Sequence, residues 1–199
     1  MINIGILDYG VGNVSSLNKS FKSIGYRSIS SADKDLLKHS DVIVLPGVGS
    51  FSYAMKRLNK SSLDQFIIDQ SINKKPIIGI CLGMQLLTNS SEEDGIHDGL
   101  SIIPGEIKKL KKSDFHIGWN NIEICEQSSF LKKFNNHEFF FNHGYAFTGS
   151  NKYVLSKTKY SENQFASSII KGNTVGFQFH PEKSQKAGLQ ILKSTINYL

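Results

Sequence analysis

The stretch of sequence that decides the fold is PIIGICLGMQLLT, residues 76–88. It opens with a short apolar run, residues 76–80, of the kind found in strands buried on both faces of a sheet. A helical pattern over residues 84–88 follows almost at once. A strand that passes directly into a helix is typical of an open parallel α/β sheet. It places Cys81 beyond the carboxyl end of the strand, where such folds build their sites.

The first 90 residues repeat this alternation of strand and helix. Apolar runs predict strands at residues 2–7 and 41–45, and helical spacing predicts helices at residues 14–24, 50–58 and 63–72. Gly25 follows the first of these helices, at the usual place for a left-handed cap. The alternation implies a mainly parallel sheet with right-handed crossovers, flanked by helices.

The second half of the chain has a different character. Residues 100–179 form short, β-rich runs broken by turns, and residues 168–170 and 174–179 flank the hairpin signal KGN at 171–173. Residues 184–199 have helical spacing. No repeat or linker divides the chain. The sequence therefore predicts one domain, residues 1–199, in which an α/β sheet carries an antiparallel β extension.

Composition excludes several classes of protein. The 199 residues are enough to bury a core without disulfides or metal. Although the net charge is +6, the lysines are spread in pairs and form no long basic run, so we expect no nucleic-acid partner. Neither an H-x-x-x-H nor a C-x-x-C pair occurs, which argues against a metal site. His39, His97 and His137 are predicted at the surface.

Three further features bear on localisation. No apolar run approaches the roughly 20 residues that span a bilayer, so we expect no membrane association. The chain opens with a strand pattern in place of a signal peptide. The two cysteines, Cys81 and Cys125, are expected as reduced thiols. These features predict a cytoplasmic protein.

Cys81 lies in the pattern G-x-C-x-G, residues 79–83, which is the nucleophile elbow with Cys in place of Ser. The two glycines leave room for a sharp strand-to-helix turn, and the turn strains the backbone of the central residue. A helix N-terminus favours a thiolate, and the Leu82 amide is placed to donate to an oxyanion. The alternative is a small buried cysteine near a strand end. Cys125 lacks an elbow and is predicted to be structural.

A thiol nucleophile needs a general base and a group that orients that base. His180 and Glu182 supply both, because residues two apart in extended backbone point the same way. Pro181 ends the strand and lets the side chains turn toward a cleft. The alternative is a strand-end histidine beside a solvated glutamate.

Two glycine-containing loops follow predicted strands. Residues 46–51, PGVGSF, can turn a backbone amide toward a developing negative charge, as a second oxyanion donor beside Leu82. The alternative is an ordinary tight turn. Residues 8–13, DYGVGN, resemble part of a dinucleotide fingerprint, but Ser15 replaces its third glycine. We expect this loop to meet a partner protein instead of a nucleotide.

The segments GICLGMQ (79–85) and FHPE (179–182) together resemble the class I glutamine amidotransferases. Within that class, the loops 8–13 and 46–51, HIGWN (116–120) and HPEKS (180–184) are similar to the glutaminase subunit of imidazole glycerol phosphate synthase. The resemblance covers the chain from its first strand to its last helix. It implies a thioester mechanism without a cofactor or metal.

The resemblance also implies residue roles and a partner. Its catalytic residues are Cys81 as nucleophile, His180 as acid/base and Glu182 as orienting group. Its oxyanion donors are Val48, Gly49 and Leu82; its glutamine-binding residues are Gln85 and Glu93, with Gly144 and Tyr145; its partner-interface residues are Asn13, His116, Trp119 and Asn120. The implied partner is a (β/α)₈ cyclase that forms a heterodimer with this chain and receives its ammonia, in histidine biosynthesis.

Two residues depart from the family pattern and keep alternatives open. Phe115 stands where the family has Pro, and Gly144 stands where it has Ser or Thr. These departures concern the partner and leave one alternative open: a paralogous amidotransferase subunit that supplies ammonia to a surface-polysaccharide sugar. Two alternatives come from other classes of protein: a thiol protease or esterase, and a non-catalytic binding subunit. Turnover of free glutamine would argue against the protease or esterase. Labelling of Cys81 by a glutamine analogue would argue against the non-catalytic subunit.

Overall fold

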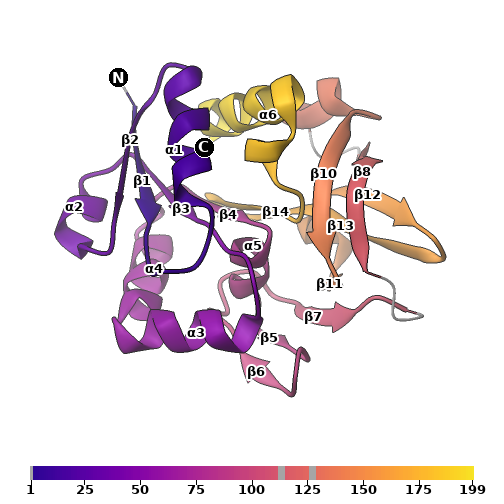
Figure 1. Ribbon diagram of the computed structural model, residues 1–199, viewed down its shortest axis with the longest axis horizontal. Helices are drawn as coiled ribbons and strands as arrows, with labels where there is room; N and C mark the ends of the chain where they lie inside the picture. Colours follow the sequence, from indigo (N-terminus) through magenta and orange to yellow (C-terminus); the bar gives the residue numbers. More distant parts are fainter. Residues whose placement is uncertain (1, 112–114, 126–128) are drawn as a thin grey trace.

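A large mixed sheet with helices on both faces forms the centre of the molecule (Figure 1). It is seen in a computed structural model that describes residues 2–111, 115–125 and 129–199. Among those residues the sheet has eight strands, in the order β2-β1-β3-β4-β14-β13-β12-β9. Their bounds are β1 Asn3–Leu7, β2 Arg27–Ser31, β3 Val42–Leu45, β4 Ile77–Ile80, β9 Glu123–Ile124, β12 Val154–Tyr160, β13 Asn163–Lys171 and β14 Thr174–Phe177.

The parallel half of the sheet runs from β2 to β14. Every residue of β3 and β4 is buried, which explains the unbroken apolar runs in the sequence. Strand β14 lies beside β4 in parallel, with Gly176 opposite Gly79 and Phe177 opposite Ile80. The segments that follow β4 and β14 therefore leave the same edge of the sheet. These are the segments that carry Cys81 and His180.

Helices cover both faces of the sheet (Figure 1), and the sheet separates two hydrophobic core clusters. On one face α1 (Val14–Ser23) and α6 (Gln185–Tyr198) bury side chains such as Phe21 and Leu192. On the other face lie α3 (Phe51–Lys60), α4 (Leu63–Ile72) and α5 (Leu82–Leu86). The short helix α2 (Lys34–Lys38) packs beside β1 and β2.

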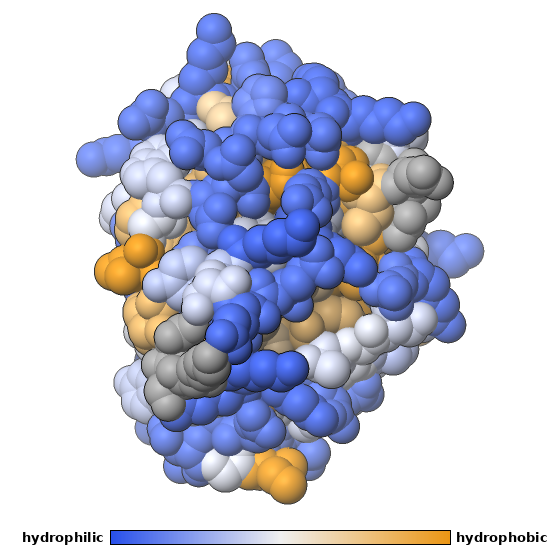
Figure 2. Space-filling view, turned by 90° about the vertical axis from the view of Figure 1, so that its right-hand side faces the viewer, coloured by the Kyte–Doolittle hydropathy of each residue, from blue (hydrophilic) through white to orange (hydrophobic). Residues whose placement is uncertain are grey.

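The antiparallel extension adds β13, β12 and β9 to the large sheet and two smaller sheets beside it. The first pairs β10 (Glu138–His143) with β8 (His116–Asn121), and the second has the order β11-β7-β5-β6. The bounds of the second are β5 Ser90–Ser91, β6 His97–Asp98, β7 Glu106–Lys109 and β11 Tyr145–Thr148. The side of the molecule that carries the extension presents separate hydrophobic areas between hydrophilic side chains (Figure 2).

The structure confirms the α/β class, the parallel first half, the 171–173 hairpin and the final helix. It corrects the helix predicted at residues 84–88. Helix α5 spans Leu82–Leu86, because it begins immediately after Cys81 with no intervening residues. The strand β2 and the helix α2 were not predicted. None of the described helices is long and apolar enough to cross a membrane.

Candidate active site

Cys81 occupies the sharp turn between β4 and α5. Its backbone has φ 53° and ψ −111°, a left-handed conformation that costs a non-glycine residue about 1–3 kcal/mol. The amide of Cys81 donates to the carbonyl of Phe177 on β14 at 2.7 Å, which ties the turn to the neighbouring strand. The residue lies directly beyond the carboxyl end of β4, as the elbow pattern predicts, and its side chain is buried.

The glycines on either side of Cys81 are required by close packing. A Cβ atom on Gly83 would lie 1.9 Å from the carbonyl oxygen of Leu45 at the end of β3. A Cβ atom on Gly79 would lie 2.7 Å from the carbonyl oxygen of Gly83. The turn therefore packs directly against the backbone of its neighbours, and this contact fixes the direction in which Cys81 points.

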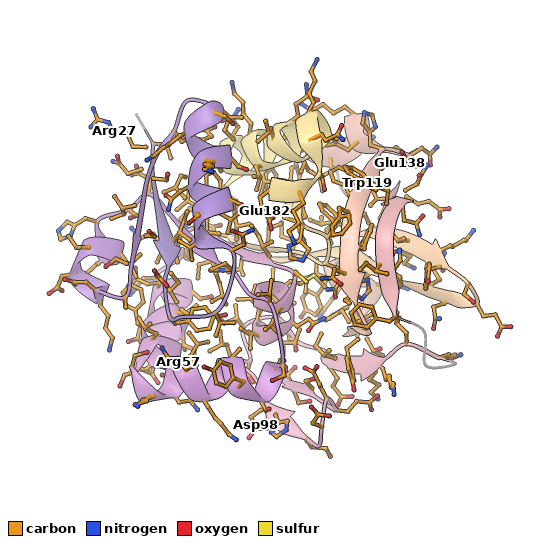
Figure 3. The ribbon with its side chains drawn as sticks, in the orientation of Figure 1. Arg27, Arg57, Asp98, Trp119, Glu138 and Glu182 are labelled. Atoms are coloured by element: carbon orange, nitrogen blue, oxygen red, sulfur yellow. The ribbon has the colours of Figure 1, made fainter. Side chains whose placement is uncertain are left out.

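His180 and Glu182 follow β14 and form a buried pair. The Nδ1 atom of His180 lies 2.8 Å from Oε1 of Glu182, and each side chain is only 2% exposed. The His180 backbone amide donates to the carbonyl of Phe140 on β10. The segment therefore leaves the large sheet here, as predicted from Pro181. Glu182 lies in the interior beneath α6 (Figure 3). Because the Glu182 carboxylate occupies Nδ1, Nε2 of His180 is the ring nitrogen available for proton transfer.

The protonation of His180 follows from its neighbours. Burial by itself lowers the pKa of His180, but Cys81 and Glu182 outweigh burial and raise this pKa to about 10. Within the described residues, Nε2 of His180 makes no hydrogen bond, and Cys81 is the neighbour that raises the pKa of this ring most. At neutral pH the ring therefore carries a proton beside the sulfur.

Cys81 and His180 line one cavity of about 300 Å³. Nearly all the residues predicted to bind or activate glutamine line it too, although they come from distant parts of the chain. Glu182 lies behind His180 and does not line it. The lining residues are Val48, Gly49, Cys81, Leu82, Gln85, Glu93, Phe115, Asn142, His143, Gly144, Tyr145 and His180.

The predicted oxyanion residues line this cavity from two adjoining segments. Leu82 is the first residue of α5, a position whose amide has no partner within the helix. Gly49 has φ +99°, a conformation that suits glycine, and a Cβ atom there would meet nothing within 4 Å. Gly47 packs closely against Leu82 and Gly83, so the loop after β3 and the start of α5 adjoin each other.

Gln85 and Glu93 present hydrogen-bond acceptors to the cavity. Both amide protons of Gln85 are used, by the Tyr145 carbonyl at 3.0 Å and by Oε1 of Gln178 at 3.2 Å. Oε1 of Gln85 is therefore the group left to meet a ligand. A carboxylate oxygen of Glu93 accepts from the Phe51 amide at 2.7 Å, and burial raises the pKa of Glu93 while this bond opposes the rise.

A hydrogen-bond chain of fixed direction lies behind Tyr145. Because a carbonyl only accepts, Nδ1 of His143 must donate to the Tyr145 carbonyl at 2.8 Å. Nε2 of His143 then accepts from Nδ1 of His116 at 3.2 Å. Nε2 of His116 in turn accepts from the side-chain amide of Asn120 at 3.3 Å. Burial lowers the pKa of His116 to about 4 and that of His143 to about 3, so both rings are neutral.

The four residues predicted at a partner interface differ in their surroundings. Trp119 is 45% exposed on β8 (Figure 3), whereas the side chain of His116 is buried between the rings of Phe141 and Tyr160. His116 can therefore reach a partner only through its neighbours. The Asn13 side chain caps α1, and that of Asn120 also donates to the Lys159 carbonyl.

Two buried residues near the site were missed from sequence. The Tyr9 hydroxyl donates to the carbonyl of Pro46 at 2.7 Å and so anchors the start of the glycine loop. Gln178 lies two residues before His180 and contacts both Gln85 and Cys81. The two-residue alternation that relates His180 to Glu182 extends to Gln178, and this was the available signal. Tyr9 lies in a predicted turn, which has no helical or strand periodicity from which its burial could be predicted.

The comparisons agree with this geometry. The family described as glutamine amidotransferase class-I matches residues 5–197. The fold and the site thus define a glutamine-hydrolysing enzyme of the class I amidotransferase type. Among solved structures, PurLQS from Thermotoga maritima is similar, with a TM-score of 0.74 and 18% identity, over 99% of this chain and 98% of that one. A structure described as a glutamine amidotransferase has a TM-score of 0.76 at 13% identity, over 98% of this chain and 99% of that one.

More similar sequences narrow the class. Proteins named imidazole glycerol phosphate synthase subunit HisH are 42% identical in Aquifex aeolicus, over 95% of this chain and 93% of the relative, and 39% identical in Archaeoglobus fulgidus, over 98% of both. The relative in Carboxydothermus hydrogenoformans is 38% identical, over 95% of this chain and 96% of its own length. The chain belongs to this HisH family of glutaminase subunits.

Proposed function

We propose that this enzyme hydrolyses glutamine through a glutamyl thioester on Cys81 and passes the ammonia to a (β/α)₈ cyclase, in the synthesis of imidazole glycerol phosphate. The observation that carries the proposal is that Cys81, at a strained elbow, and His180 line one cavity, while the buried Glu182 holds His180 from behind. The names of the relatives supply the acceptor reaction.

The first half of the reaction uses the proton on His180. The Cys81 sulfur attacks the side-chain amide carbon of glutamine and forms a tetrahedral intermediate. Amides at Leu82 and in the Val48–Gly49 segment stabilise its oxyanion, and loss of one such donor costs ~2.7–4 kcal/mol of transition-state stabilisation. His180 then gives its proton to the departing nitrogen, so that ammonia leaves and the thioester remains.

In the second half, His180 accepts a proton from water as the water attacks the thioester carbonyl. The carbon–sulfur bond breaks, which releases glutamate and restores the thiolate beside a protonated imidazole. Glu182 holds Nδ1 throughout, so that Nε2 keeps facing the sulfur. No step requires a metal or a cofactor.

Recognition of the free amino acid is proposed to rest on acceptors in the cavity. Oε1 of Gln85 and the carboxyl group of Glu93 both lie at its wall, and such oxygens suit the ammonium group of glutamine. Gly144, where a side-chain hydroxyl is expected in the family, can contribute only its backbone. The carbonyl of Tyr145 acts indirectly, because it accepts a hydrogen bond from Gln85 and holds that side chain in place.

The docking surface for the cyclase is proposed on the outer face of β8. Phe115, Ile117 and Trp119 are 56%, 63% and 45% exposed and alternate along the chain, so they project together. Phe115 also lines the active-site cavity. A partner that covers these side chains would therefore close the mouth through which ammonia leaves. Partner contact can also switch the Val48–Gly49 peptide that supplies an oxyanion donor.

A comparison of glutaminase rates tests this function. The purified chain is assayed for glutamate release alone, with the (β/α)₈ cyclase of the same organism, and with the cyclase-like subunit of a sugar-amidating pathway. The proposal expects stimulation by the first partner and complementation of a histidine auxotroph. Stimulation by the second alone would favour the sugar-amidating alternative, and an unchanged rate with either would contradict the switch.

A further inference from the structure

Gln178 is a buried polar residue that the reaction described above does not use. It follows β14, and its side chain is fully buried. Its amide nitrogen lies 3.9 Å from the sulfur of Cys81, and its amide oxygen accepts from Nε2 of Gln85 at 3.2 Å. One side chain thus touches both the nucleophile and a residue of the substrate cavity.

The orientation of this amide is fixed by its surroundings. Gln85 donates to the Tyr145 carbonyl, which can only accept, so the nitrogen and oxygen of Gln85 cannot be exchanged. The second proton on the same nitrogen must find an acceptor, and that acceptor is Oε1 of Gln178. The N–H groups of Gln178 are consequently left on the side of the Cys81 sulfur.

A donor at this position acts on the charged form of the sulfur. Hydrogen bonds to an ionised group are about twice as strong as bonds between neutral groups, and here the bond lies in a buried site. The Cys81 thiol also has a neutral-state partner, the Asn142 carbonyl at 3.8 Å, which accepts from S–H and favours the uncharged form. Gln178 opposes this preference from the β14 side.

We propose that Gln178 is a further catalytic residue: its amide N–H groups stabilise the Cys81 thiolate, and its oxygen holds Gln85 in place for glutamine. The proposal rests on the proposed role of Cys81 as nucleophile. Gln178, His180 and Glu182 then lie at every second position of one segment. Gln178 stabilises the sulfur, His180 carries the proton, and Glu182 orients His180.

Alkylation of Cys81 by iodoacetamide tests this proposal without requiring glutaminase turnover. The full chain is used in a Cys125→Ala background, so that Cys81 is the only thiol. Gln178→Met keeps the size of the side chain and removes both polar groups. We expect its alkylation rate near pH 7 to fall about 10-fold, and its rate near pH 10, where thiolate forms without help, to match the parent.

A second variant separates the two roles of Gln178. Gln178→Glu keeps an oxygen toward Gln85 but replaces the donor beside the sulfur with a negative charge. We expect it to lose alkylation rate at neutral pH as Gln178→Met does, with a lower kcat and a KM for glutamine close to that of the parent. Gln178→Met is expected to raise KM as well, because Gln85 loses its acceptor.

The matched control is Gln70→Met, the same change at a buried glutamine on α4 that does not line the cavity. It should alkylate as the parent does, and thermal melting is measured for every variant. Parent-like alkylation of folded Gln178→Met or Gln178→Glu at neutral pH would overturn the inference while leaving the proposed function standing. Failure of the parent Cys81 to react faster than a simple thiol near pH 7 would overturn both.

Discussion

At the residue scale, the proposed chemistry depends on the pairing of His180 with Glu182. Replacing Glu182 with Gln keeps the shape of the side chain and removes the charge that lies 2.8 Å from Nδ1. Cys81 raises the pKa of His180 most and Glu182 adds to the rise, so loss of the Glu182 charge lowers this pKa and weakens the bond that orients the ring. We expect kcat for glutamine hydrolysis to fall about 10²–10⁴-fold, and the alkaline limb of the rate profile to move to lower pH.

The control for this variant is Glu106→Gln, which changes an exposed carboxylate on β7 that pairs with Lys108. It should leave the rate and its pH profile unchanged. A Glu182→Gln enzyme with the parent's kcat and the parent's pH profile would show that the pair does not serve catalysis.

The neutral histidine chain gives a second prediction at this scale. With a pKa of about 4 for His116 and about 3 for His143, both rings should remain neutral from pH 5.5 to 8. Nitrogen-15 NMR of histidine-labelled protein should show both rings with the proton on Nδ1, as the direction of the chain requires. Protonation of either ring above pH 5.5 would contradict this arrangement.

Sequence was informative at the residue scale where chemistry is carried by local patterns. The pattern G-x-C-x-G determined the position of Cys81, and the two-residue step related His180 to Glu182. Burial of His116 could not be read in the same way, because alternation along a strand gives two faces and does not say which one is covered. The contact of Tyr9 with Pro46 joins loops 37 residues apart, which no local pattern encodes.

At the scale of elements, the strand–turn–helix unit depends on close backbone contact. Gly83→Ala would place a methyl group 1.9 Å from the Leu45 carbonyl oxygen, and backbone cannot move aside as a side chain can. We expect the free energy of unfolding to fall by more than about 2 kcal/mol, toward the upper part of the range for overpacking. Urea denaturation measures this loss.

Gly144→Ala is the matched control for stability, because the one described residue that a methyl group there would meet is Phe115, through its movable, exposed ring at 3.1 Å. Its unfolding free energy should stay within about 0.5 kcal/mol of the parent. Equal stability of both variants would mean that the elbow is not packed as described.

The elements that sequence missed are those without an apolar pattern. Strand β2, RSISS, lies at the edge of the large sheet, where β1 is its one partner among the described strands, and its residues are mostly exposed. Its place is set by backbone hydrogen bonds, which leave no trace in hydropathy. Helix α2 has only five residues, too few for a periodic signal. Helix α5 was predicted two residues late, since no propensity marks a cysteine as the start of a helix.

At the scale of the whole molecule, the exposed apolar side chains of β8 are proposed to hold the cyclase. Large aromatic residues at the centre of such surfaces contribute most of the affinity. We expect Trp119→Ala to raise the dissociation constant of the complex with the cyclase about 30-fold, measured by titration calorimetry. Ile72→Ala, at an exposed residue of α4 beyond the amino end of β4, is the control and should bind as the parent does.

The site as a whole gathers residues from both halves of the chain. The parallel sheet brings Cys81 and His180 to one edge, and the antiparallel extension supplies Asn142, His143, Gly144 and Tyr145 as the opposite wall of the cavity. This arrangement explains how a nucleophile elbow and a histidine 99 positions later form a single centre. The class of fold predicted the shared edge, and the family resemblance predicted Gly144 and Tyr145, whereas Asn142 and His143 were found as lining residues only in the structure.

The most direct test of the central claim is labelling of the chain with acivicin, an electrophile that resembles glutamine, followed by mass mapping of the modified peptide. The account predicts one adduct, on Cys81, which free glutamine suppresses and which Cys81→Ala abolishes, with Cys125 unmodified. Absence of an adduct on Cys81, or labelling of both cysteines alike without protection by glutamine, would contradict it.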